Sequence, residues 1–122
     1  MSYDSPNYLI RREHRESNVT GVASTSVRKI LMFQAAKLKK VHALVVTAGT
    51  NTAAGFDILV GTTSVGEVTL GTNTAGYSAS SALLNADVPA MGVIDLKGKA
   101  NSATLVASFS VEHEVDPSAV ES

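Results

Sequence analysis

Residues 103–115 read ATLVASFSVEHEV, and this segment has the strongest strand pattern in the chain. Small or apolar side chains, joined by His113, occupy every second position, and the positions between them hold Thr, Ser and Glu, interrupted only by Val106. Because successive side chains of a strand point to opposite faces, this alternation predicts a strand with one buried and one wet face. The predicted buried row is Ala103, Leu105, Ala107, Phe109, Val111, His113 and Val115.

Working outward, apolar and β-branched runs separated by turn-forming residues predict further strands. These strands cover residues 27–34, 41–48, 56–60, 65–70 and 92–96, with a tight hairpin at 61–64 and an exposed turn around Lys37, Lys39 and Lys40. Residues 77–88 fit a loop, a strand or a short helix, and the pattern leaves this open. Since no helical period separates the strands, we expect an all-β domain over residues 19–115, a small β-sandwich or jelly roll.

The two ends of the chain differ from this domain. Residues 1–18 are polar or charged except for one short apolar patch, and they have no apolar stripe that would anchor a helix. We expect an extended N-terminal arm over residues 1–18 and a C-terminal tail over residues 116–122, which contain Pro117. The expected partner contacts of the arm are Tyr8, Leu9, Ile10, Arg11, Arg12 and Arg15.

Composition excludes several classes of protein. The chain has no cysteine, which removes disulfides and thiolate chemistry and fits a reducing cytoplasm. It contains no apolar stretch long enough to span a membrane, and its first residues do not resemble a secretory signal. We therefore expect no membrane partner.

Charge is distributed unevenly along the chain. Residues 1–40 contain eight Lys and Arg against three Asp and Glu, whereas residues 41–122 contain two against eight. Two readings stay open: solvated faces, or a basic part that meets an acidic surface such as that of a neighbouring copy. Aromatic residues are not interleaved with the basic ones and the net charge is −1, so we expect no nucleic-acid partner.

No motif in the sequence predicts catalysis. His14, His42 and His113 are far apart and lack the spacing of metal ligands. His113 lies between Glu112 and Glu114, but neighbours along a strand point to the opposite face. The carboxylates show no paired spacing, and no serine lies in a nucleophile elbow. We therefore expect no enzyme activity, no metal and no cofactor.

One strand is apolar on both faces. Residues 27–34 include Ile30-Leu31-Met32-Phe33, and such a strand is either central or covered by a partner. In a domain this small, we expect Ile30, Met32 and Phe33 to contact other subunits.

Several runs resemble a known class of protein. They are VHALVVTAGT from residue 41, GFDILVG from residue 55, GEVTLG from residue 66 and LVASFSVE from residue 105. In their high content of Ala, Thr, Gly and Val, these runs resemble the small head decoration, or cement, proteins of tailed bacteriophages. The resemblance implies a virion structural protein that binds the outer surface of the phage head, with the major capsid protein and its own copies, as a homotrimer, for partners. It also implies assembly in the host bacterial cytoplasm.

Two other functions fit an all-β domain of this size. One is a receptor- or carbohydrate-binding β-sandwich of a phage tail or fibre, which needs an exposed aromatic or polar pocket. The other is a hydrolase or isomerase on a jelly-roll barrel, which needs His and carboxylate side chains converging inside the barrel.

Overall fold

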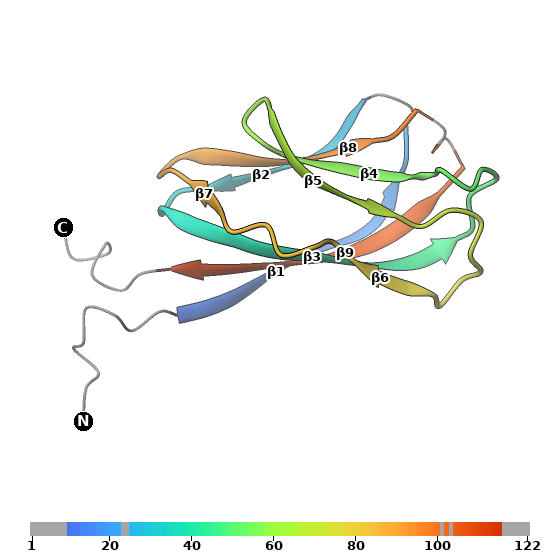
Figure 1. The fold of residues 1–122 in the computed structure, drawn as a ribbon, viewed down its shortest axis with the longest axis horizontal. Helices are drawn as coiled ribbons and strands as arrows, with labels where there is room; N and C mark the ends of the chain where they lie inside the picture. The colour runs from blue at the N-terminus through green and yellow to red at the C-terminus, as the bar shows by residue number, and fades with distance from the viewer. Residues whose placement is uncertain (1–9, 23–24, 101, 103, 116–122) are drawn as a thin grey trace.

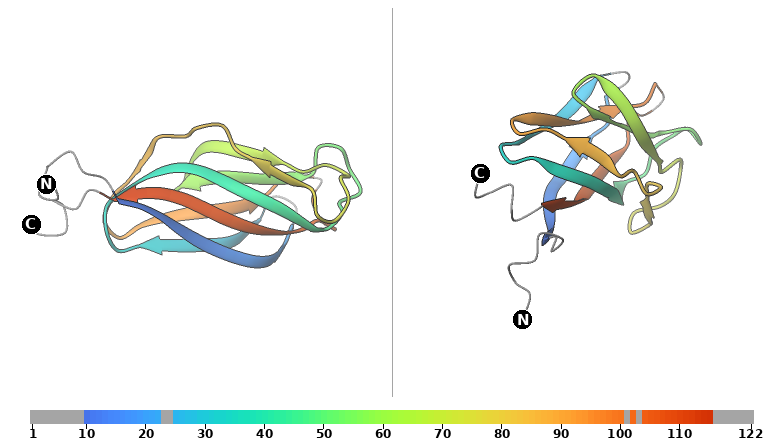
Figure 2. Two further views of the ribbon diagram at one scale, coloured as in Figure 1. Left: turned by 90° about the horizontal axis from the view of Figure 1, so that it is seen from below. Right: turned by 60° about the vertical axis from the view of Figure 1, so that its left-hand side comes forward.

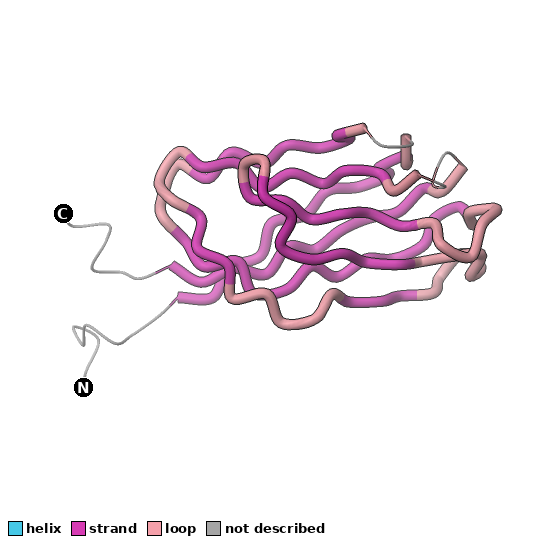
Figure 3. The backbone as a smooth tube through the Cα atoms, turned by 45° about the horizontal axis from the view of Figure 1, so that its top comes forward, coloured by secondary structure: helices cyan, strands magenta, loops and turns pink. Residues whose placement is uncertain are grey.

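The computed structural model describes residues 10–22, 25–100, 102 and 104–115. These residues form strands, turns and loops and no helix (Figure 3), so the all-β prediction is confirmed for them, and they hold no helix that could cross a membrane. The strands are β1 (Ile10–Thr20), β2 (Ser26–Met32), β3 (Ala36–Thr47), β4 (Gly55–Val60), β5 (Thr63–Thr69), β6 (Ser78–Ser80), β7 (Ala86–Val88), β8 (Gly92–Gly98) and β9 (Val106–Val115).

The strands form two sheets that face each other as a β-sandwich (Figures 1 and 2). One sheet has the order β1-β9-β3-β6, with β7 also paired to β3, and the other has the order β2-β8-β4-β5. All of these pairs are antiparallel. β1 begins and β9 ends at the same end of the sandwich, which we call the open end (Figure 1).

The strand predicted from alternation lies inside the first sheet, between β1 and β3. Its burial alternates from Val106 to Val115, so the buried row from Ala107 onward is confirmed. Leu105 is also fully buried, but it precedes the strand, and Ala103 lies outside the described residues. The regular alternation arises because the inner face of β9 packs on the second sheet while its outer face meets solvent.

The core lies between the two sheets. Phe56 of β4 and Phe109 of β9 meet across it edge to face, with ring centroids 4.8 Å apart. Such an aromatic pair stabilises the fold by about 0.5–1.5 kcal/mol beyond the contribution of the apolar area that it buries. The largest side chains that join Phe56 in complete burial are Leu38, Ile58, Leu70, Ile94, Leu96 and Leu105.

The predicted N-terminal arm requires a correction. Residues 10–18 belong to β1, which pairs with β9 from Ile10↔Val115 to Thr20↔Val106. The backbone groups of this polar segment form hydrogen bonds with the free edge of β9. Such pairing does not require an apolar stripe of side chains, so the absence of a stripe did not exclude a strand. Residues 1–9 and the predicted tail 116–122 lie outside the described residues.

Two other predicted elements differ in the structure. β3 begins at Ala36, so Lys37, Lys39 and Lys40 lie within a strand and not in a turn. The open segment 77–88 contributes the short strands β6 and β7, which pair with the same side of β3 at 42–44 and 36–38. Between them the backbone stays attached, because the Leu84 N–H donates to the Lys39 carbonyl.

Candidate functional site

The described residues expose several large apolar side chains near the open end. Leu31 is 58% exposed, Phe33 78% and Met91 62%. Leu31 pairs with Val93 and Met32 with Gly92, so Leu31 on β2 and Met91 just before β8 lie at the same end of two paired strands. A cluster of exposed apolar side chains is typical of a protein-binding surface.

The three predicted subunit contacts do not share one environment. Ile30 is only 5% exposed and belongs to the core, so its prediction as a subunit contact is wrong. Its side chain is on the face of β2 that packs against the other sheet, whereas Leu31 is on the opposite face. Met32 packs partly against the core and Phe33 is exposed, so these two can reach a partner.

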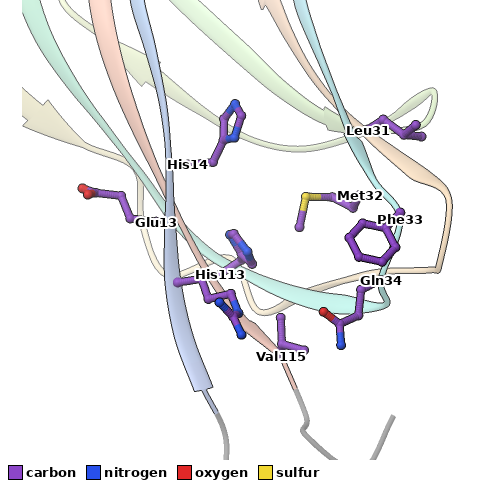
Figure 4. A pocket seen from close by; sticks show the side chains of 9 residues that line it. Glu13, His14, Leu31, Met32, Phe33, Gln34, His113 and Val115 are labelled. Carbon is purple, nitrogen blue, oxygen red and sulfur yellow. The ribbon is translucent and has the colours of Figure 1, made fainter. Parts of the chain in front are cut away.

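A groove of about 640 Å³ lies at the open end, between β1 and β9 on one side and β2 on the other (Figure 4). We call it the open-end groove. Its lining is Arg12, Glu13 and His14 from β1, Leu31 and Met32 from β2, Phe33 and Gln34 from the following turn, and His113 and Val115 from β9. The sequence-predicted contacts Arg12, Met32 and Phe33 thus meet in one place.

His113 is buried in the lining of this groove. Its ring is on the side of β9 that faces Met32 (Figure 4), and its Nδ1 makes no hydrogen bond within the described residues. Burial lowers the pKa of His113 below its ordinary value of 6.5. An interaction with the Val111 backbone partly opposes this shift, and the nearby His14 and Arg12 reinforce it. The neutral imidazole is therefore favoured here.

The groove-facing side of β1 carries polar side chains. His14 Nε2 lies 2.6 Å from Glu16 Oε2, and Arg28 Nε of β2 lies 3.1 Å from Glu16 Oε1, which links the two sheets. Arg12 pairs in register with His113 and makes no ion pair with the described residues. Inward-pointing charges on an edge strand discourage pairing with other chains.

The outer face of the same sheet carries a chain of polar contacts. His42 Nδ1 lies 2.6 Å from Ser80 Oγ, and His42 Nε2 lies 3.1 Å from Glu112 Oε1. Glu13 accepts hydrogen bonds from Ser110 and Arg15, which hold its pKa below the ordinary value.

The contacts of His42 have the residue types of a hydrolase triad. However, β3 pairs on both sides at this point, so its amides are engaged and do not offer an oxyanion site. The described residues also contain no cluster of His, Cys, Asp and Glu that could hold a metal ion. We interpret the polar contacts as ordering the wet face of the sheet.

The arm contacts predicted from sequence are divided among different places. Tyr8 and Leu9 lie outside the described residues. Ile10 and Arg11 are in β1, opposite Val115 and Glu114. Arg12 lines the open-end groove, whereas Arg15 is on the outer face, where its Nε donates to Glu13 over 2.9 Å.

The sequence did not predict the other six groove residues, which are Glu13, His14, Leu31, Gln34, His113 and Val115. One signal was available: Arg12, His14 and Glu16 alternate with Glu13 and Arg15 in strand fashion. The strand was not predicted from this pattern because the side chains on both faces of the strand are polar, so apolar and polar residues do not alternate.

Comparison with known proteins gives little similarity. No family model matches the sequence, and no curated protein matches it. Among solved structures, the fold is similar to a chain described as "Structure of infectious bursal disease virus Gx strain". The match has 11% sequence identity and a TM-score of 0.43, and it covers 91% of this chain and 33% of that chain. The present chain therefore spans about a third of that protein's length.

Proposed function

We propose that this protein is a non-catalytic virion structural protein, a decoration protein that binds the outer surface of a tailed-phage head. In that role it joins neighbouring major capsid subunits, and it associates with its own copies as a homotrimer. It needs neither nucleic acid nor a membrane, and it is assembled in the host cytoplasm. The resemblance of its strands to phage cement proteins suggests this role.

The observation that carries the proposal is the exposed apolar cluster of Leu31, Phe33 and Met91 beside the open-end groove. Phe and Met are enriched where proteins bind one another, and burying such side chains stabilises a complex. Clamping a shell requires surface of this kind and no reactive group. The apolar cluster is therefore the expected capsid-contacting surface.

The test is co-sedimentation of the purified protein with expanded, empty heads of tailed phages. Leu31→Ser combined with Phe33→Ser is expected to weaken binding at least tenfold, because each lost apolar contact is worth about 1.5–3 kcal/mol when fully buried. Tyr77→Ser with Leu83→Ser is the matched control, since these side chains are 44% and 56% exposed and do not line the groove. The control is expected to bind like the unmodified protein.

Circular dichroism of each variant separates loss of binding from loss of fold. If the unmodified protein binds no head and also sediments as a monomer at every concentration, the proposed function is wrong. Equal binding by the Leu31/Phe33 variant and its control would place the contact surface elsewhere.

A further inference from the structure

The open-end groove contains a polar atom that the described residues leave without a partner. His113 is 6% exposed, and its Nδ1 makes no hydrogen bond. Buried polar groups in folded proteins are paired in about 90% of cases or more, so an unpaired ring nitrogen in a groove calls for an explanation. A ligand atom that hydrogen-bonds to Nδ1 provides one.

Charge in the groove favours an anionic ligand. The acidic side chains nearby are already paired, Glu13 with Arg15 and Glu16 with Arg28. Arg12, which lies opposite His113 in the strand register, has no ion-pair partner among the described residues. A carboxylate between Arg12 and His113 would satisfy both side chains.

The rest of the groove is suited to a short polypeptide segment. Its volume of about 640 Å³ lies within the range of about 300–1,000 Å³ that is usual for ligand clefts. Met32, Phe33 and Val115 provide apolar contacts beside the charged group. The expected ligand is therefore an extended segment with a carboxylate close to an apolar side chain.

The sequence contains such a segment. Residues 116–122 read DPSAVES, with Asp116 and Glu121 as acids and Val120 beside Glu121. They follow Val115, which itself lines the groove, and seven extended residues reach at most about 25 Å. A segment of this length can extend from Val115 to a groove that lies within about 25 Å on an adjacent molecule.

We propose that residues 116–122 of one copy bind in the open-end groove of a neighbouring copy, with an acidic side chain against Arg12 and His113. This rests on the self-association in the proposed function. The contact is head to tail, and such contacts close into a ring when the rotation between copies allows it. It also gives a role to the basic first part and the acidic second part of the chain.

Sedimentation velocity on charge-reversed full-length proteins tests this contact. Arg12→Glu, and separately Asp116→Arg with Glu121→Arg, are each expected to weaken self-association at least tenfold. Combining all three substitutions is expected to restore it, because the charges are then exchanged. Lys29→Glu is the matched control, since this lysine of β2 is exposed and does not line the groove. It is expected to leave association unchanged.

A mixing experiment distinguishes a neighbouring copy from the same chain. The Arg12→Glu protein keeps an unmodified C-terminal segment, and the Asp116/Glu121 variant keeps an unmodified groove. Mixed together, two proteins that do not self-associate are expected to form a heterodimer through the remaining intact contact. No heterodimer would mean that the segment does not act between copies, which overturns the inference.

NMR of the His113 ring nitrogens supplies a direct readout. Their signals are expected to shift with concentration in the unmodified protein and to stay constant in the Asp116/Glu121 variant. Self-association with unaltered His113 signals would overturn the inference. Head binding is measured separately, so assembly through the groove without head binding would contradict only the proposed function.

Discussion

Phe56 is the single side chain with the greatest expected effect on stability. It is fully buried and packs edge to face on Phe109 of the opposite sheet. Phe56→Ala is expected to lower the free energy of unfolding by about 3–5 kcal/mol, because it removes apolar burial and leaves a cavity. Urea denaturation followed by circular dichroism measures this loss.

Phe33→Ala is the matched control for Phe56→Ala. Phe33 is 78% exposed, so its truncation is expected to change the free energy of unfolding by less than about 0.5 kcal/mol. Equal losses for the two variants would contradict the assignment of Phe56 to the core.

His113 makes stability depend on pH. Burial lowers the pKa of His113 in the folded state below 6.5, so the unfolded chain binds the proton more readily. The stabilisation is complete above about pH 6.5 and decreases below it, by at most about 1.4 kcal/mol per pH unit, until the folded-state pKa is reached. The thermal midpoint of the unmodified protein is therefore expected to be lower at pH 5.5 than at pH 7.5.

His113→Gln isolates this effect from the carboxylates, which titrate in both proteins. The stability difference between the unmodified protein and the variant is expected to become smaller at pH 5.5 than at pH 7.5. A difference independent of pH would show that His113 is not the responsible group.

At the scale of elements, the pairing of β4 with β5 depends on a close approach at Gly55. A Cβ atom built at Gly55 would lie 2.2 Å from the backbone oxygen of Val68, which cannot move away cheaply. Gly55→Ala is expected to lower the free energy of unfolding by about 1–3 kcal/mol through overpacking. The urea midpoint measures the loss.

Gly61→Asn is the comparison within the same hairpin. Gly61 has a φ of 64° and open space around it, and Asn tolerates this left-handed conformation. The substitution is expected to be nearly neutral. A larger loss for Gly61→Asn than for Gly55→Ala would contradict the importance of the close approach.

The sequence predicted elements with a strong period better than elements without one. β9 was predicted because its two faces differ, one packed on the core and one wet. β1 was predicted as an arm because polar side chains occupy both of its faces, and its strand conformation depends on hydrogen bonds to β9. The same polar pattern concealed Glu13 and His14 as groove residues.

At the scale of the whole molecule, strand order sets the folding rate. β1 pairs with β9, so Ile10 must find Val115 across almost the entire chain. Closing such a large loop costs entropy before the contacts form, and we expect refolding on the millisecond-to-second timescale that is usual for β-sandwiches. Stopped-flow fluorescence of the tyrosines after dilution from urea measures it, and refolding in microseconds would contradict this topology.

The amino-acid sequence was sufficient to predict the all-β class, the buried row of β9 and most strand positions, because these follow from local alternation and turn chemistry. Three of the predicted contact residues, Arg12, Met32 and Phe33, line the open-end groove, and their contact with a partner stays a prediction. Three features became known only from the folded molecule: Ile30 belongs to the core, residues 10–18 form an edge strand, and His113 lines a groove. Which face of a strand is covered, and which distant strands become neighbours, depends on pairing between remote segments, and no local pattern encodes it.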